Sequence, residues 1–284
     1  METPAAEHDI DAQLVERLVG AQHPRFSAPA RLVANGWDNV MFRLGDEHVA
    51  RLPRRTIAAT LLENEVAWLP SIAERMPVAV PTPVAVGAPG LGYPWPWYIA
   101  RWFDGTPVDG TPLSARDAVA DDLAAALRAL HVPAPASAPP NPVRGVPLVA
   151  RDAVARARIH DAVLLEAWER GLAAAPYDGP PLWLHGDLHP GNAIIDDGRL
   201  AAIIDFGDVC SGDPASDLAA AWLFFGPDGR QRFRDGLEYD DATWLRAAAW
   251  AASFASFMLD ESEAAARMSA VGRHTLQQLE AADF

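Results

Sequence analysis

Two stretches decide the fold of this chain of 284 residues, namely His185-Gly-Asp-Leu-His-Pro-Gly-Asn192 and Ile203-Ile-Asp-Phe-Gly207. Between them, the apolar runs 193–195 and 200–204 predict two strands of a hairpin, with the polar run 196–199 as its turn. This arrangement places Asp187 and Asn192 in a loop before the hairpin and Asp205 just after it. The sequence therefore predicts a compact set of oxygen-bearing side chains.

These side chains have the chemistry of a phosphate-transfer site. Mg²⁺ prefers oxygen ligands and bridges phosphates, so Asn192 and Asp205 are candidate Mg²⁺ ligands. Asp187 would then accept the proton of an attacking hydroxyl group. The order His-x-Asp-x-x-x-x-Asn followed by Asp-Phe-Gly is the pattern of kinases. Each motif alone is weak, and the alternative is that both aspartates are turn residues, but the two motifs in order favour the kinase interpretation.

The same residues resemble the aminoglycoside phosphotransferase family, which comprises kinase-like enzymes that act on small molecules. Further segments carry the resemblance: Gly36–Asn39, Val49–Arg55, Glu65, Gly90–Trp97, Asn141–Leu148 and Gly212–Asp217. The resemblance implies an α+β, two-lobed protein-kinase-like fold, with a small N-terminal antiparallel sheet lobe and a larger, mainly helical C-terminal lobe. It implies that Asp187 is the catalytic base and that Asn192 and Asp205 hold Mg²⁺. We expect residues 1–103 to form the nucleotide-binding lobe with the interlobe linker, and residues 104–284 to form the catalytic and substrate-binding lobe.

The periodicity of apolar residues is consistent with two such lobes. In the first, it predicts helices over 11–19 and 58–74 and strands over 28–33, 40–44, 48–52 and 97–102. In the second, it predicts helices over 114–131 with a serine N-cap, over 150–174 and over 244–259.

The phosphate anchor must be an arginine, because all 23 basic residues of the chain are arginines. Members of the family place a basic residue on the third strand and pair it with a glutamate of the next helix. Arg51 occupies the matching position and Arg54 is the alternative, while Glu65 is the expected partner and Glu63 the second choice. A plain structural alternative is that Arg51 only caps an exposed strand end.

The other nucleotide contacts are predicted at a turn and at the linker. The turn at 35–39 takes the place of a glycine-rich loop: Gly36 permits close backbone approach, and Asp38 and Asn39 present donors and acceptors. The alternative is a simple hairpin turn. Adenine is expected against the linker near 99–102, through backbone groups, and Ile99 and Arg101 are assigned to this contact.

Several residues near the motifs are expected to be structural. His185 resembles the scaffold histidine of the family, and Asp213 and Asp217 resemble residues that fasten the catalytic loop. Asp217 also fits an acidic first-turn residue or the cap of a helix over 218–225. The single cysteine, Cys210, is expected to be inert packing.

The charge of the chain limits its partners. With 38 acidic and 23 basic residues the net charge is −15, which makes nucleic acid an unfavourable partner. An acidic cleft would attract a cationic substrate, but a solvated acidic face is the favoured alternative. The acidic residues concerned are Glu238, Asp240, Asp241, Asp260, Glu261 and Glu263.

The cellular location is predicted from the lack of a signal-peptide pattern and of a membrane-spanning apolar run. The first ten residues are polar and acidic, unlike a signal peptide, and no apolar run reaches the length of a membrane span. We expect a cytoplasmic protein without a membrane partner.

The predicted function is Mg²⁺-dependent transfer of the γ-phosphate of ATP or GTP to a hydroxyl group of a small molecule. An aminoglycoside or a related antibiotic is the expected acceptor, as in a resistance enzyme. The alternatives are a metabolic kinase for a sugar or an amino alcohol, and a pseudoenzyme that binds nucleotide. A protein kinase is disfavoured because no Ala-Pro-Glu segment follows Asp205.

Overall fold

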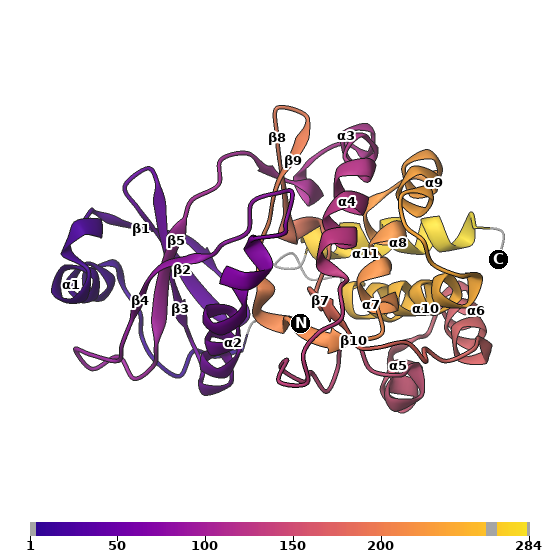
Figure 1. Cartoon of the computed structure of the whole chain (residues 1–284), viewed down its shortest axis with the longest axis horizontal. Coiled ribbons are helices and arrows are strands. Elements are labelled where there is room, and N and C mark those ends of the chain that lie inside the picture. The colour runs from indigo at the N-terminus through magenta and orange to yellow at the C-terminus, as the bar shows by residue number, and fades with distance from the viewer. Residues whose placement is uncertain (1–3, 260–265, 283–284) are drawn as a thin grey trace.

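The computed structural model describes residues 4–259 and 266–282 and has the predicted two-lobed, kinase-like α+β fold (Figure 1). Among the described residues, the N-terminal lobe contains a five-stranded antiparallel sheet in the order β1-β2-β3-β5-β4. Its strands are β1 Ala30–Asn35, β2 Asn39–Leu44, β3 His48–Pro53, β4 Pro83–Gly87 and β5 Trp97–Arg101.

Two helices cover opposite faces of this sheet, because successive side chains of a strand point to opposite faces. Helix α1 spans Ala12–Gln22, and helix α2 spans Thr56–Ala73. On β5, Ile99 packs in the cluster that contains α1, whereas Tyr98 packs with Leu62 of α2. In Figure 1, α1 lies at the outer end of the molecule and α2 lies beside the second lobe.

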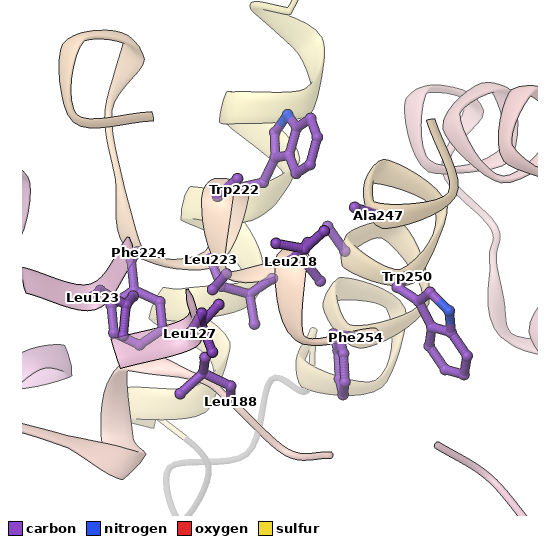
Figure 2. Packing of buried hydrophobic residues seen from close by; sticks show 14 of the residues in the cluster. Leu123, Leu127, Leu188, Leu218, Trp222, Leu223, Phe224, Ala247, Trp250 and Phe254 are labelled. Atoms are coloured by element: carbon purple, nitrogen blue, oxygen red, sulfur yellow. The ribbon is translucent and has the colours of Figure 1, made fainter. Parts of the chain in front are cut away.

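The second lobe is built around α10, which spans Asp241–Met258 and packs against α6 and α11 (Figure 1). Figure 2 shows leucine, tryptophan and phenylalanine side chains of α4, α7, α8 and α10 packed into its core. The other helices are α3 Leu113–Ala118, α4 Ala120–Leu130, α5 Asp152–Arg158, α6 Ala162–Ala173, α7 Ala215–Leu218, α8 Ala220–Phe224, α9 Pro227–Asp235 and α11 Ala266–Glu280.

Short strands frame the two decisive stretches of sequence. Strands β8 (Ala193–Asp196) and β9 (Arg199–Ile203) form the predicted hairpin, and β6 (Thr106–Pro107) pairs with β8. Strand β7 (Leu182–Leu184) pairs with β10 (Cys210–Gly212). The loop 185–192 and the turn 204–209 therefore both run between the same two small sheets. Single-turn 3₁₀ helices are η1 Pro24–Phe26, η2 Val108–Gly110, η3 Leu148–Arg151, η4 Pro190–Asn192 and η5 Phe206–Asp208.

Two predicted helices are each divided in the structure. The segment 114–131 breaks at Val119, and it begins at Leu113 after Pro112 rather than with a serine cap. Just before the break, the side chain of Asp117 accepts a hydrogen bond (2.9 Å) from the amide of Gly226, the N-cap of α9. The segment 150–174 divides into η3, α5 and α6, because the side chain of Asp161 caps the start of α6.

No helix within the described part of the chain combines the length and the apolar character that a membrane crossing requires.

Helix α2 offers a matched test of the packing. Leu62 is 1% exposed, and Ile57 on the same helix is 63% exposed. We expect Leu62→Ala to lower the free energy of unfolding by about 2–5 kcal/mol, because it opens a cavity against the sheet. Ile57→Ala should change it by less than about 0.5 kcal/mol. Urea denaturation measures both, and equal losses would contradict this packing.

Candidate active site

A cleft of about 620 Å³ is lined by residues of both predicted motifs, Asp187 and Asp205 among them, whereas the buried Asn192 is not in its lining. The β1–β2 turn and β3 supply one part of its wall, and the loops around the β8–β9 hairpin, the segment 143–158 and α10 supply most of the rest. Its lining includes Gly36, Trp37, Asp38, Asn39, Arg51, Arg144, Arg151, Arg158, Asp187, His189, Asp205, Asp208, Trp250, Phe254, Phe257 and Met258.

The loop that carries Asp187 is held in place by hydrogen bonds to the carboxylate of Asp217. The amides of His185 and Gly186 donate hydrogen bonds to the two oxygens of this carboxylate, at 2.7 and 2.9 Å. His131 Nε2 lies 3.3 Å from Asp217 Oδ2. Burial would raise the pKa of Asp217, but the hydrogen bonds and the nearby histidines outweigh it and lower that pKa. The fastening role is therefore found, whereas a cap of a helix over 218–225 is not, because Asp217 lies inside α7.

Gly186 gives the loop a backbone that only glycine adopts without strain. Its φ is +85°, and a Cβ at this position would lie 2.4 Å from the carbonyl oxygen of Asp208. This close approach brings the Asp187 loop and the turn after β9 together.

Hydrogen bonds join Asn192 to Asp187 and to Ile204, the neighbour of Asp205. The Asn192 side chain donates to the carbonyl of Asp187 (2.9 Å), and the amide of Ile204 donates to the carbonyl of Asn192 (2.9 Å). His185 Nε2 lies 2.9 Å from the carbonyl oxygen of Ile204, in agreement with a scaffold role for this histidine. The three predicted functional residues are thus held in one connected unit.

The donor set fits an Mg²⁺ ion that arrives with a nucleotide. The amide nitrogen of Asn192 is engaged, so its oxygen is the atom that can bind a cation, and the Asp205 side chain is 48% exposed. No group of three or more acidic, histidine or cysteine side chains in residues 4–259 and 266–282 could hold a metal by itself. This agrees with Mg²⁺ chemistry, in which one or two protein ligands act together with phosphate oxygens.

Arg51 is the centre of a buried ionic network. Its Nη2 lies 3.1 Å from Glu65 Oε1 and 2.5 Å from Asp205 Oδ1, and the hydroxyl of Tyr98 donates to Glu65 Oε2 at 2.8 Å. Arg51 is 4% exposed, so it does not cap an exposed strand end. The other candidate pair is placed elsewhere: Arg54 Nη1 donates to the carbonyl of Gly36 (2.6 Å), and Glu63 is exposed.

Burial and ion pairing shift the pKa values of this network in opposite directions. Burial would lower the pKa of Arg51, but the carboxylates of Asp205 and Glu65 hold it well above its ordinary value. Burial raises the pKa of Glu65 to about 7, although Arg51 opposes this shift. For Asp205, burial acts to raise the pKa, and Arg51 outweighs it and lowers that pKa.

The turn at 36–39 is held closed by two arginines that the sequence analysis did not assign. Besides the Arg54 side-chain bond, the amide of Arg54 donates to the carbonyl of Asp38 (2.8 Å), and the guanidinium of Arg55 pairs with the Asp38 carboxylate. Asn39 Oδ1 and Arg51 Nε are among the buried side-chain atoms of the described residues that have no hydrogen-bond partner. The signal for this role was the Arg-Arg pair directly after β3.

Ile99 and Arg101 do not line the cleft. The side chain of Ile99 is buried among residues of α1 and β2, and Arg101 is exposed at the end of β5. A contact of Ile99 with adenine would have to use backbone atoms, so this assignment stays a prediction.

Arg144 is a cleft residue that the sequence analysis missed. Its Nη2 donates to Asp187 Oδ1 at 3.0 Å, and His189 Nε2 lies 3.7 Å from Asp187 Oδ2. The only signal was the resemblance of the segment Asn141–Leu148 to the family.

The expected structural residues lie away from the cleft. Asp213 accepts from Arg246 (2.7 Å), and Cys210 is buried. Asp240 caps α10 through the amide of Thr243, and like Glu238 and Asp241 it is not among the cleft residues. Asp260, Glu261 and Glu263 lie outside the described residues.

Comparisons with known proteins identify a similar family and similar structures. A model of APH, the phosphotransferase enzyme family, matches residues 29–250. No curated protein matches the sequence.

Several solved structures have the same fold. The GDP and kanamycin complex of APH(2")-IIia matches with a TM-score of 0.71 and 21% identity, over 95% of this chain and 99% of that chain. ADP-bound aminoglycoside phosphotransferase APH(2'')-Ib has a TM-score of 0.62 and 17% identity, over 95% and 99%. Macrolide 2'-phosphotransferase type I has a TM-score of 0.60 and 22% identity, over 99% and 100%. At these identities the likeness shows the fold.

The fastening of the loop can be tested by Asp217→Asn. An amide has one acceptor oxygen in place of two, so at least one buried N–H group loses its partner. We expect a loss of about 1–3 kcal/mol in the free energy of unfolding for each such group. Urea denaturation measures this loss, and exposed Asp241→Asn is the control. An Asp217→Asn variant as stable as the control would show that the carboxylate does not hold the loop.

The raised pKa of Glu65 predicts a dependence of stability on pH. Between the unfolded value of 4.5 and the folded value of about 7, the folded state binds more protons than the unfolded state. The contribution of Glu65 to stability is thus complete below pH 4.5 and falls as the pH rises to about 7. The free energy of unfolding of Glu65→Gln minus that of wild type should therefore be larger at pH 8 than at pH 5. Urea denaturation at both pH values measures this difference. A relative stability that is constant or changes the other way would contradict the burial of this carboxyl group.

Proposed function

Because the chain belongs to the phosphotransferase enzyme family, we propose that it transfers the γ-phosphate of ATP or GTP to a hydroxyl group of a small molecule, with Mg²⁺ bound. Family membership confirms the predicted resemblance and the predicted class of enzyme, a phosphotransferase that acts on an alcohol group. The observation that carries the finer proposal is the connected unit of Asp187, Asn192 and Asp205, of which Asp187 and Asp205 line the cleft.

Residues 1–103 are proposed to bind the nucleotide. The buried guanidinium of Arg51 presents its charge to the cleft and would anchor phosphate oxygens, while Glu65 fixes its orientation. The turn formed by Gly36, Asp38 and Asn39, closed by Arg54, would cover the phosphates with backbone and side-chain donors.

Residues 104–284 are proposed to supply the metal ligands, the base and the acceptor pocket. Asn192 and Asp205 would hold Mg²⁺, which when bound neutralises charge on the transferred phosphoryl group. Asp187 would orient the acceptor hydroxyl and take its proton. Because Arg144 occupies Oδ1 of Asp187, the free oxygen is Oδ2, on the side of His189. Most of the acceleration would come from positioning and from fixed charges.

An antibiotic is the proposed class of acceptor. Similar structures include a kanamycin complex and a macrolide phosphotransferase, and activity of this kind would confer resistance. A metabolic kinase with the same chemistry is the second candidate, because none of Glu238, Asp240 and Asp241 lines the cleft to receive a polycation. The intact set of Asp187, Asn192 and Asp205 argues against a pseudoenzyme.

The role of Asp187 is tested by Asp187→Ala. We expect phosphoryl transfer to fall by about 10²–10⁴-fold, because the variant lacks the group that takes the proton. Transfer is measured by coupled detection of nucleoside diphosphate, with a panel of antibiotics and hydroxylated metabolites, with and without Mg²⁺. Nucleotide affinity, measured by calorimetry, should stay within about threefold of wild type, a difference below 1 kcal/mol.

The control is Asp196→Ala, at an exposed position of the β8–β9 hairpin. It should keep wild-type rates. Near wild-type turnover by Asp187→Ala would exclude Asp187 as the base. Transfer that does not depend on Mg²⁺ would exclude the proposed role of Asn192 and Asp205.

A further inference from the structure

The acceptor side of the cleft, next to Asp187, is lined by arginines and by aromatic side chains. The arginines are Arg144, Arg151 and Arg158, and the large apolar residues are Trp37, Trp250, Phe254, Phe257, Met258 and Met268. Trp37 of the β1–β2 turn and Phe257 of α10 face each other with ring centroids 6.4 Å apart, and each is 40% exposed. A ligand that enters here therefore meets positive charge and apolar surface together.

Arg144 is fixed by its own segment. The amides of Val143 and Arg144 donate to Asn141 Oδ1 at 2.9 and 3.1 Å, and Asn141 Nδ2 donates to Asp208 Oδ1 at 2.7 Å. The guanidinium carbon of Arg144 lies 4.8 Å from the ring centroid of Phe254. This arginine is thus held between an aromatic face and Asp187, at the boundary between the catalytic residues and the acceptor side.

Arg151 and Arg158 stand at the two ends of α5, and neither has a carboxylate within ion-pair distance among the described residues. Arg158 lies 5.5 Å from the ring centroid of Phe257. Burial lowers the pKa of Arg151, and the charges of Arg144 and Arg158 lower it further, so the three cations are close enough to repel one another. By contrast, Arg156 on the same helix pairs with Asp152 (2.8 Å) and Glu169 (3.1 Å).

The acidic side chains that line the described part of the cleft already have ion-pair or hydrogen-bond partners. Asp187 pairs with Arg144 and Asp205 pairs with Arg51, while Asp208 accepts from Asn141. Asp38 pairs with Arg55, outside the acceptor side. A polycationic acceptor would have to break these contacts and approach two guanidinium groups that have no carboxylate partner in residues 4–259 and 266–282, which costs free energy.

We infer that the acceptor of this enzyme carries an anionic group, a carboxylate or a phosphate, attached to an apolar body. Arg151 and Arg158 bind the anion, the surface formed by Phe257, Trp37 and Met258 packs on the apolar part, and the hydroxyl group reaches Asp187. The inference rests on the proposed phosphotransferase function and narrows its acceptor to a class different from a polyamine antibiotic.

The inference is tested by calorimetric binding of four small probes that share a phenyl ring. Phenylacetate and phenyl phosphate are anionic, phenylacetamide is neutral, and phenethylamine is cationic. All titrations contain saturating Mg²⁺ and a non-hydrolysable ATP analogue, so that anions do not bind at the nucleotide phosphate site. We expect the anions to bind about tenfold or more tightly than the amide, and the amine to bind most weakly. The ratio of phenyl phosphate to phenylacetate affinity separates a phosphate from a carboxylate as the preferred anion.

Substitutions of Arg151 and Arg158 test whether these two residues cause the preference for anionic probes. The double variant R151Q/R158Q should lose about tenfold in affinity for the anions and keep its affinity for phenylacetamide. R151E/R158E should reverse the order, so that phenethylamine binds more tightly than phenylacetate. Arg156→Gln, on the same helix but outside the cleft, is the control and should behave as wild type. Thermal unfolding of each variant shows whether it is folded.

The inference is overturned by equal affinities for the anionic and cationic probes, by anion binding that R151Q/R158Q leaves unchanged, or by no anion binding at roughly 10 mM. Because binding is measured without turnover, these outcomes are separate from failure of the proposed function. Asp187-dependent transfer to kanamycin without anion binding would sustain the function and overturn the inference. Anion binding that depends on Arg151 and Arg158 would sustain the site even if no transfer occurred.

Discussion

The contact of the Arg51 guanidinium with Glu65 and Asp205 is the interaction on which the rest of the site depends. Its three members come from β3, from α2 and from the turn after β9, so it connects the sheet lobe to the catalytic lobe. A buried guanidinium is costly unless it is paired, and the two carboxylates together offset that cost. A chain with no lysine has to meet this need with arginine, whose planar donors can contact two carboxylates at once.

A second buried polar cluster supports the same site from the opposite side. Asp217 receives the amides of His185 and Gly186, and His185 in turn bonds to the carbonyl before Asp205. Residues 185–189 have no helix or strand structure, so these side-chain acceptors satisfy backbone groups that a helix or a sheet would otherwise satisfy. Asp187, Asn192 and Asp205 are thus held between two ionic or hydrogen-bonded clusters, while the acceptor side is bounded by α5 and α10.

Much of the fold could be predicted from local pattern, and the failures have identifiable causes. The strands of the first lobe and the β8–β9 hairpin lie within a few residues of their predicted bounds, because turns and apolar runs are local signals. The helices predicted over 114–131 and 150–174 were too long. The second break coincides with the cap formed by Asp161, and the first lies beside Asp117, whose side chain contacts the N-cap of α9 more than a hundred residues away.

The sequence by itself determined the chemistry proposed for the site, because the two decisive stretches place their oxygen-bearing side chains within about twenty residues of one another on either side of a hairpin. It also required the proposed phosphate anchor to be an arginine. Only the tertiary structure decided that Arg51 rather than Arg54 faces the cleft, that Arg54 and Arg55 close the turn, and that Arg144 meets Asp187. Arg51 and Asp205 are 154 positions apart, and Arg144 and Asp187 are 43 apart. Contacts over such separations leave no periodic signal in the chain, since only tertiary packing, between the lobes for Arg51 and Asp205 and within the second lobe for Arg144 and Asp187, brings these residues together.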